Sequence, residues 1–155
     1  GRLHFVGHSL GALIIRKILI IHRPERLGRV VMLGPPNHGS EVTDFLQSYK
    51  FYKKMYGMVG QQLCTTCSDL ISHHETINYE LGVIAGDRSI DWLFSLFLLP
   101  GKNDGKVTVE STKIEGMQDH IVLHATHTFM ASNRHVIHQV AYFLEHGCFE
   151  RKGKK

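Results

Sequence analysis

Gly7-His8-Ser9-Leu10-Gly11 is the stretch that decides the fold of this chain. The apolar run Leu3-His4-Phe5-Val6 precedes it and the apolar run Ala12-Leu13-Ile14-Ile15 follows it, which predicts a strand that turns abruptly into a helix. A Gly-x-Ser-x-Gly at such a junction is typical of a nucleophile elbow, in which the serine is strained and both glycines let strand and helix approach closely. A glycine-rich turn with a capping serine is the alternative.

The apolar pattern downstream predicts helices and strands that alternate. A helix over 10–22, apolar nearly all round, is expected to lie buried against a sheet and to stop at Pro24. Three further strands are expected, at 28–34, 79–86 and 121–126. Strands of this near-continuous apolar kind belong to parallel sheets that helices cover on both faces. The sequence therefore predicts an α/β fold with a mostly parallel sheet.

The last element expected is a closing helix over 133–146, ended by Gly147. Its apolar face would consist of Val136, Ile137, Val140, Phe143 and Leu144.

The segments between these elements offer places for a ligand. The loop 35–39 follows the second strand, at the sheet edge where α/β proteins bind ligands, and Ser40 is expected to cap a helix that begins at Glu41. Two apolar segments, 45–58 and 92–99, are candidates for the walls of an acyl pocket. Core packing of the first and a buried short helix at the second are the alternatives.

Length and composition indicate one domain. The 155 residues are 43% hydrophobic, which is enough for a buried core, and we expect a domain over 1–150 followed by a basic tail over 151–155. The net charge of +4 lies partly in that tail, so neither nucleic acid nor a membrane surface is the expected partner. The apolar runs are too short for an integral membrane segment.

The chain begins at Gly1, almost directly on the serine strand. We therefore expect it to be the C-terminal portion of a larger fold with further strands before it, and the sequence assigns neither a compartment nor an oligomeric state.

Cys64-Thr65-Thr66-Cys67 has the C-x-x-C spacing of zinc and redox sites, and His73 and His74 follow it. There is no second C-x-x-C and no strand and helix frame this one, so we expect no metal and no cofactor.

A serine nucleophile needs a histidine to take its proton and an acid to orient that histidine. The candidate acids are Asp87, Asp91 and Asp104. Asp87 comes directly after the third strand, whereas Asp104 lies in the turn Asn103-Asp104-Gly105, which would expose its carboxylate. Both positions remain open on the residues alone.

The candidate bases are His120, His124 and His127. Alternation along the last strand leaves His124 within it, whereas His127 falls just past its end, where a base belongs.

Five motifs occur in an order that is far more specific than the serine motif alone: 7–11, 34–40, 84–89, 103–111 and 126–130. In this order Gly-His-Ser-Leu-Gly, Gly-Pro-Pro-Asn-His-Gly-Ser, Ile-Ala-Gly-Asp-Arg-Ser, Asn-Asp-Gly-Lys-Val-Thr-Val-Glu-Ser and Thr-His-Thr-Phe-Met resemble the bacterial lipase and esterase-like branch of the α/β-hydrolase superfamily. The resemblance covers the chain from Gly1 to about Glu150. It implies that Asp104 is the acid and His127 the base.

The same resemblance implies that Asp87 is structural and either pairs with Arg88 or caps its loop. The family takes a second oxyanion donor from a loop after an earlier strand, which this chain does not contain. Loss of one such donor costs on the order of a hundredfold in rate, so we expect this chain alone to be weakly active or inactive.

The function expected from the sequence is that of a serine hydrolase of carboxylic esters, with Ser9, Asp104 and His127 as the triad and a small-molecule or lipid ester as substrate. Leu10 and His8, the neighbours of the serine, are the candidate oxyanion and substrate-binding residues. An acyltransferase or thioesterase with the same triad is one alternative. A catalytically incomplete fragment or interaction module is the other.

Overall fold

The computed structural model describes residues 1–37, 77–89 and 102–151. Its longer elements are β1 (Leu3–His8), α1 (Leu10–Ile21), β2 (Leu27–Leu33), β3 (Leu81–Gly86), β4 (Asp119–Leu123) and α6 (Arg134–His146). Two short 3-10 helices, η1 (Glu110–Thr112) and η2 (Met130–Ser132), flank β4 along the chain.

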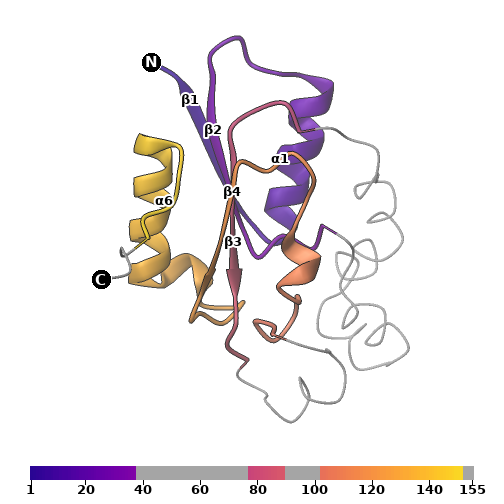
Figure 1. Ribbon diagram of the computed structural model, residues 1–155. Helices are drawn as coiled ribbons and strands as arrows, with labels where there is room; N and C mark the ends of the chain where they lie inside the picture. The colour runs from indigo at the N-terminus through magenta and orange to yellow at the C-terminus, as the bar shows by residue number, and fades with distance from the viewer. Residues whose placement is uncertain (38–76, 90–101, 152–155) are drawn as a thin grey trace, which may run out of the picture.

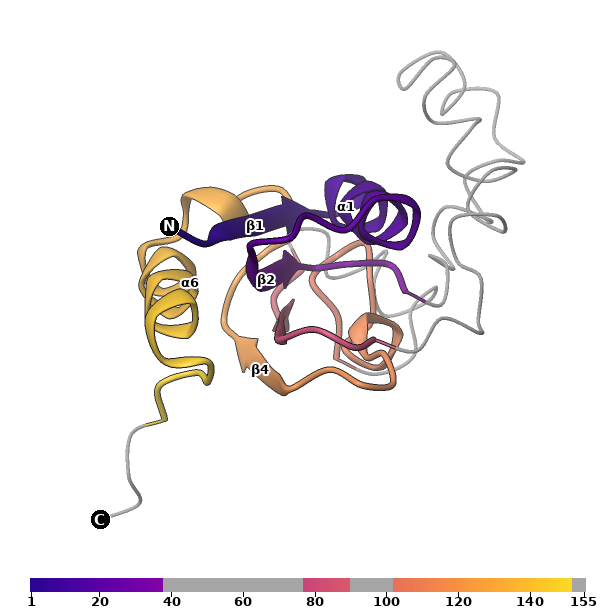
Figure 2. The same ribbon diagram turned by 90° about the horizontal axis from the view of Figure 1, so that it is seen from above.

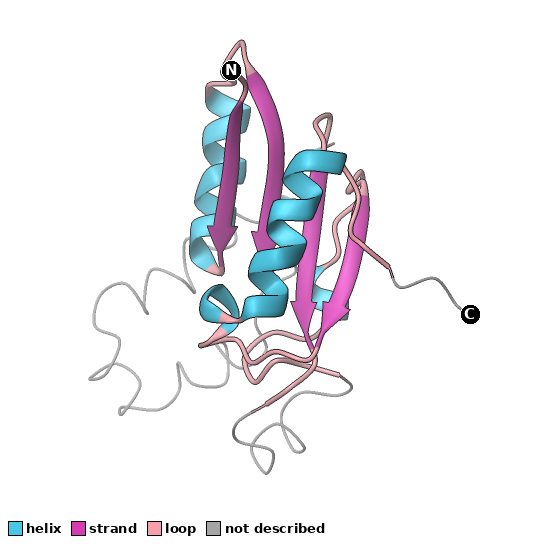
Figure 3. Cartoon of the chain, turned by 90° about the vertical axis from the view of Figure 1, so that its left-hand side faces the viewer, coloured by secondary structure: helices cyan, strands magenta, loops and turns pink. Residues whose placement is uncertain are grey.

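The strands form one four-stranded sheet in the order β1-β2-β3-β4. Every neighbouring pair is parallel, and Figure 3 shows all four arrowheads at the same edge of the sheet. The segments that follow the strands therefore gather at that edge, which is where the sequence predicts the site.

The two long helices cover opposite faces of the sheet (Figures 1 and 2). On the α1 face, Val30 and Met32 of β2 pack with Ala12 and Leu19. The intervening β2 residues, Val31 and Leu33, belong to the core on the α6 face together with Val136, Phe143 and Phe149. Both faces of β2 are buried, which confirms the expected parallel sheet with helices on both faces.

Helix α1 is buried against the sheet as expected, but on one side only. Ile14, Ile18 and Ile21 are exposed, because the i, i+4, i+7 spacing places them together on the side of α1 turned away from the sheet. Arg16, by contrast, is almost fully buried.

Helix α6 begins and ends as expected. The Asn133 side chain accepts hydrogen bonds from the N–H groups of His135 and Val136, and Gly147 ends the helix in the left-handed conformation with φ 78°. The expected apolar face is wrong in one position: Ile137 is 52% exposed. Gln139 of the same helix is buried instead. Its Nε2 donates to the carbonyl oxygen of Glu150, and its Oε1 accepts from the N–H of Glu150.

The last strand begins two residues before the expected range 121–126 and ends three residues before its end, since β4 covers Asp119–Leu123. It ends where the carbonyl oxygen of Leu123 accepts from the N–H groups of Asp87 and Ala125. His124 therefore follows the strand instead of lying within it.

Several expected features lie outside the described residues: the helix capped by Ser40, the apolar segments 45–58 and 92–99, the Cys64–Cys67 pair, and Asp91. Across residues 1–37, 77–89 and 102–151, no helix has the length and apolar character needed to cross a membrane.

Candidate active site

Ser9 lies between the last residue of β1 and the first residue of α1. Its backbone has φ 54° and ψ −123°, and it is the single non-glycine residue with positive φ in the described part of the chain. Such a conformation costs on the order of 1–3 kcal/mol and persists only where the surroundings enforce it. One such constraint is the hydrogen bond from the Ser9 N–H to the carbonyl oxygen of Leu33, at 2.9 Å.

Gly7 lets α1 lie close to β1, as expected. A Cβ atom at this position would stand 2.7 Å from the Cα atom of Ala12, which is too close for any side chain. The same expectation for Gly11 is wrong, because a Cβ atom there would have no described atom within 4 Å. The close approach of strand and helix therefore depends on the glycine before Ser9.

Asp104 is buried, with its side chain 0% exposed, which corrects the expectation of an exposed turn carboxylate. The turn folds around the carboxylate: the N–H groups of Lys106 and Val107 donate to Oδ1 at 3.0 and 2.9 Å. The other oxygen, Oδ2, lies 2.7 Å from Nδ1 of His127. Both oxygens thus have partners that compensate for the loss of water.

The His127 ring lies between Asp104 and Ser9. Its Nδ1 faces the carboxylate and its Nε2 lies 2.9 Å from the Ser9 hydroxyl oxygen. A carboxylate only accepts, so Nδ1 carries the proton and Nε2 is left free to accept from the hydroxyl. The main chain is fixed as well, because the His127 N–H donates to the Asp104 carbonyl oxygen at 3.0 Å.

Gly34, directly after β2, is a site residue that the sequence analysis missed. It has φ 51°, and a Cβ atom there would lie 3.1 Å from both Asp104 Oδ2 and His127 Nδ1. The acid and the histidine therefore pack directly on the backbone of this glycine. A glycine directly after a buried strand and before two prolines was the available signal.

A second feature that the sequence analysis missed joins three segments near the site. The Arg16 guanidinium donates to Asn37 Oδ1 at 2.9 Å, and Asn37 Nδ2 donates to the carbonyl oxygen of Thr112 at 2.7 Å. This network ties the helix after Ser9 to the loop after β2 and to η1. The signal was an arginine within an otherwise apolar helix.

Leu10 and His8 flank the serine on either side. Leu10 is the first residue of α1, where N–H groups have no acceptor within the helix and are free for a ligand. The His8 ring lies against that of His127, with the ring centroids 5.0 Å apart. Burial, followed by the nearby His127, lowers the pKa of His8 below its usual 6.5.

The other candidate acid and bases have partners of their own. Asp87 was expected to pair with Arg88 or to cap its loop. Its carboxylate instead pairs with His124, Oδ1 to Nδ1 at 3.0 Å. His120 Nε2 lies 3.0 Å from Thr112 Oγ1, and burial, followed by the charge of Lys113, lowers its pKa. The structure thus brings one of the expected acids and one of the expected bases to Ser9.

Two hollows lie among the described residues close to the segment 124–133, which carries His127. The smaller, about 240 Å³, is mostly apolar and is lined by Val6, His8, Leu33, Ala131, Val136, Ile137 and Val140. The larger, about 430 Å³, is lined by Arg88, Ser89, His124, Ala125, Thr126, Phe129 and Asn133. Within the three described ranges, no group of three or more His, Cys, Asp or Glu side chains could hold a metal ion.

A parallel sheet with a strained serine between strand and helix, and with an acid and a histidine on later loops in that order, is the arrangement of the α/β-hydrolase fold. The comparisons with solved structures agree. Over 93% of its length the chain is similar to the mature form of the lipase BlEst2 from Bacillus licheniformis, with a TM-score of 0.65 and 18% identity. The propeptide form of that lipase matches 99% of the chain, with a TM-score of 0.67 and 16% identity.

Phospholipase PlaB from Legionella pneumophila, in complex with thio-NAD, matches 88% of the chain with a TM-score of 0.52 and 18% identity. The chain spans 64% of the mature lipase, 37% of the propeptide form and 40% of the phospholipase. No protein-family model and no curated protein sequence matches it. The chain thus has the fold of bacterial lipases, at an identity that shows the fold alone.

Proposed function

We propose that this chain carries the catalytic residues of a serine hydrolase that cleaves carboxylic esters. The observation that carries the proposal is the placement of one imidazole between a buried carboxylate, 2.7 Å from Nδ1, and the hydroxyl of Ser9, 2.9 Å from Nε2. These distances suit transfer of the serine proton to the ring. The strained backbone of Ser9 supports the same reading, because strain of this kind is found where it positions a reacting group.

In the reaction we propose, Ser9 Oγ attacks the acyl carbonyl carbon while its proton passes to Nε2 of His127. The tetrahedral intermediate collapses, the bond to the leaving alcohol breaks, and His127 returns the proton to that alcohol oxygen. A water then gives a proton to His127 as its oxygen attacks the acyl carbon. Ser9 leaves with that proton, and the carboxylic acid is released.

Asp104 has two tasks in this scheme: it keeps the proton of His127 on Nδ1, and it stabilises the positive ring that forms at each step. The Leu10 N–H is the proposed donor to the oxyanion, since it opens α1 at the positive end of the helix dipole. His8 is the remaining candidate beside the serine.

The test uses p-nitrophenyl esters of increasing acyl length and a fluorophosphonate probe that reacts with activated serines. Both are applied to this chain and to a longer protein that contains it, each with Ser9→Ala. We expect turnover and labelling that fall by about a thousandfold or more in Ser9→Ala, because the nucleophile is lost.

Product analysis then separates the related reactions. Carboxylic acid as the product from an ester establishes the hydrolase, whereas transfer to an added alcohol or preference for a thioester would assign an acyltransferase or a thioesterase. Weak or absent labelling of this chain alone is expected, since it has one oxyanion donor. A folded longer protein without Ser9-dependent labelling would refute the proposal and favour an interaction module.

A further inference from the structure

We propose that Asn37 is a positioning residue, which holds the turn that carries Asp104 in place relative to the helix that begins after Ser9. This inference rests on the proposed function, since it assigns Asn37 a task in the same reaction. In the described part of the chain, the side-chain hydrogen bonds of Asn37 go to Arg16 and Thr112 and not to the triad. Its effect on the reaction therefore passes through the position of other groups.

Asn37 lies three residues after the point at which its loop touches the site. The loop begins at Gly34, directly after β2, where the Gly34 N–H donates to the Ile84 carbonyl oxygen at 2.8 Å. A Cβ atom on Gly34 would lie 3.1 Å from both Asp104 Oδ2 and His127 Nδ1. The acid and the histidine therefore rest on the same short loop that Asn37 fixes.

Both ends of the Asn37 amide have a partner, although the residue is only 3% exposed. The Arg16 guanidinium donates to Oδ1 at 2.9 Å, and Nδ2 donates to the carbonyl oxygen of Thr112 at 2.7 Å. Because a guanidinium only donates and a carbonyl only accepts, the amide would lose both bonds if it turned over. Asn37 is therefore held in one orientation between two elements of the fold.

The first partner ties Asn37 to the nucleophile. Arg16 belongs to α1, which begins directly after Ser9, and it is almost fully buried. A buried guanidinium is costly without acceptors, so the fold favours the arrangement in which Asn37 Oδ1 stays beside it. Helix α1 in turn packs on the sheet through Ala12 and Leu19, so Arg16 and Ser9 are carried by one rigid element.

The second partner ties Asn37 to the acid turn, which is the segment 103–108. Thr112 ends η1, which follows this turn, and its hydroxyl donates to the Val109 carbonyl oxygen at 2.7 Å. The Val109 N–H donates to the Lys102 carbonyl oxygen at 2.9 Å and closes the base of the turn. A shift of Thr112 is therefore transmitted to the turn and to its carboxylate.

Movement of the acid turn would displace the base together with the acid. Asp104 bonds the His127 ring at 2.7 Å and also accepts from the His127 N–H at 3.0 Å, so the turn carries both groups. The Ser9 hydroxyl lies 2.9 Å from His127 Nε2 but belongs to the other side of the bridge that Asn37 makes. Asn37 thus joins the two parts whose separation decides whether the serine proton can be transferred.

The test variant is Asn37→Asp in the protein that shows Ser9-dependent activity. Its carboxylate still accepts from Arg16 but places an oxygen against the Thr112 carbonyl, so the bond toward the acid turn is the one that is lost. Thr112 keeps its contact with His120, Oγ1 to Nε2 at 3.0 Å. The turn is therefore expected to shift and not to unfold.

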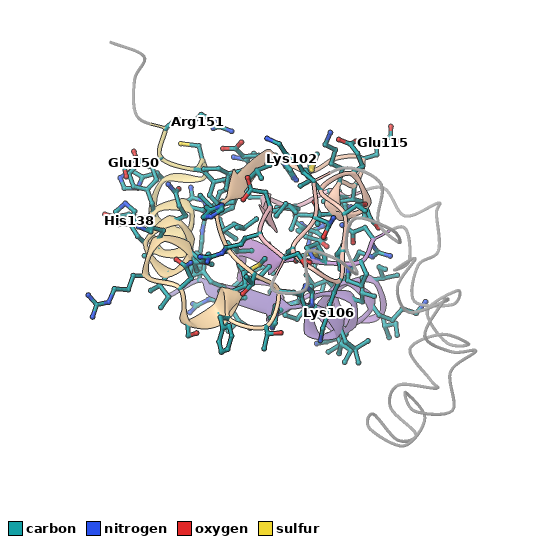
Figure 4. All side chains as sticks on the ribbon, turned by 90° about the horizontal axis from the view of Figure 1, so that it is seen from below. Lys102, Lys106, Glu115, His138, Glu150 and Arg151 are labelled. Carbon is teal, nitrogen blue, oxygen red and sulfur yellow. The ribbon has the colours of Figure 1, made fainter. Side chains whose placement is uncertain are left out.

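Gln139→Glu is the matched control. The Gln139 amide is also buried, accepts from the N–H of Glu150 with one end and donates to the carbonyl oxygen of Glu150 with the other. The same loss of a donor therefore occurs far from the acid turn, because Glu150 and Lys106, a residue of that turn, lie on opposite sides of the molecule in Figure 4. Urea unfolding measures the loss of stability in both variants.

We expect Asn37→Asp to lower kcat for the best p-nitrophenyl ester by about tenfold to a hundredfold and to change KM by less than about twofold, because a displaced acid and base slow proton transfer and leave binding intact. The NMR signal of the His127 Nδ1 proton is expected to move, because it reports the hydrogen bond to Asp104 Oδ2. Gln139→Glu should lose stability and keep the wild-type kcat and signal.

A folded Asn37→Asp with the wild-type kcat or the wild-type signal would refute the inference, and so would an equal fall of kcat in Gln139→Glu. If Asn37→Asp does not fold, Arg16→Lys decides, since it keeps the charge but shortens the reach to Asn37 Oδ1. Its kcat should fall by about threefold to tenfold, and a folded Arg16→Lys with the wild-type kcat would contradict the inference. Absence of Ser9-dependent turnover in the wild type would instead refute the proposed function, on which the inference rests.

Discussion

Replacement of Asp104 by asparagine is expected to remove activity while it leaves the turn folded. Asparagine has the same shape, so its oxygen still accepts from the N–H groups of Lys106 and Val107. Its amide nitrogen, however, would face Nδ1 of His127, 2.7 Å away. Because that nitrogen donates, the ring must turn its unprotonated Nδ1 toward it and its Nε2 proton toward Ser9. A base in this tautomer cannot accept the serine proton.

The same site gives a magnitude for stability. Asp104→Ala would leave the partly buried N–H of Lys106 and the buried N–H of Val107 without an acceptor, at about 1–3 kcal/mol each, so the two main-chain groups alone would cost about 2–6 kcal/mol, and His127 Nδ1 would lose its partner as well. Asp104→Asn keeps both bonds and is expected to lose only about 1–2 kcal/mol, the difference between a charged and a neutral hydrogen bond. The fall in rate for Asp104→Asn should reach about ten-thousandfold, the size seen when a triad acid is replaced in this way in another serine hydrolase.

The assay combines fluorophosphonate labelling rates with urea unfolding at pH 7. Asp119→Asn is the matched control, since Asp119 also accepts from two backbone N–H groups, those of His120 and Phe149. Its only other side-chain partner in the described structure is Arg151. The control should lower stability and leave labelling unchanged. Labelling of folded Asp104→Asn at the wild-type rate would show that the carboxylate does not set the tautomer, and the assignment of Asp104 would be wrong.

Three further predictions concern Gly34, Asn37 and His120. Gly34→Ala places a side chain at a position with a left-handed backbone and directs it toward Asp104 and His127. We therefore expect the free energy of unfolding in urea to fall by about 1–2 kcal/mol and the labelling rate to fall by more than about tenfold. Labelling at the wild-type rate would contradict this. Asn37→Ala breaks the bonds to Arg16 and Thr112, so the free energy of unfolding should fall by about 3 kcal/mol, and a change below about 1 kcal/mol would refute the network's role. Burial lowers the pKa of His120, so the unfolded chain binds more protons below pH 6.5 and stability should fall as the pH drops from 6.5 through the folded pKa. In urea unfolding of His120→Gln this slope should be smaller but still present, because burial lowers the pKa of His8 as well. An unchanged slope in His120→Gln would contradict the prediction.

The elements that the sequence predicted well are those with a local signal. The strand and helix around Ser9 follow from one apolar run on each side, and the cap of α6 follows from Asn133 and Gly147. The burial of Asp104 had no such signal, because a turn of polar residues looks solvated until a histidine 23 positions away closes over it. The choice between Asp87 and Asp104 likewise depended on a resemblance and not on spacing.

Long-range contacts also decide which side of α1 is buried. A helix that is apolar all round gives no direction for its buried side, so nothing in 10–22 says that Ile18 faces outward and Arg16 inward. The buried side of α1 also holds Ala12, Leu13 and Leu19, and there the Arg16 guanidinium finds Asn37, 21 positions away, as its acceptor. A charge placed inside the protein needs such a partner, and a partner is found only in three dimensions.

The arrangement at the sheet edge favours a reaction that needs fixed groups over one that needs a flexible binding surface. Parallel strands end together, so residues that follow β1, β2 and β4 closely in the chain meet at one edge: Ser9 follows β1, Gly34 follows β2, and His127 lies four residues after β4. Each group is then held by backbone, since Ser9 bonds Leu33 and His127 bonds Asp104 through main-chain N–H groups. Binding alone would not require a serine in a conformation that costs free energy. Proton transfer between a hydroxyl and an imidazole does require that their separation be held near 2.9 Å, and this rigidity provides it.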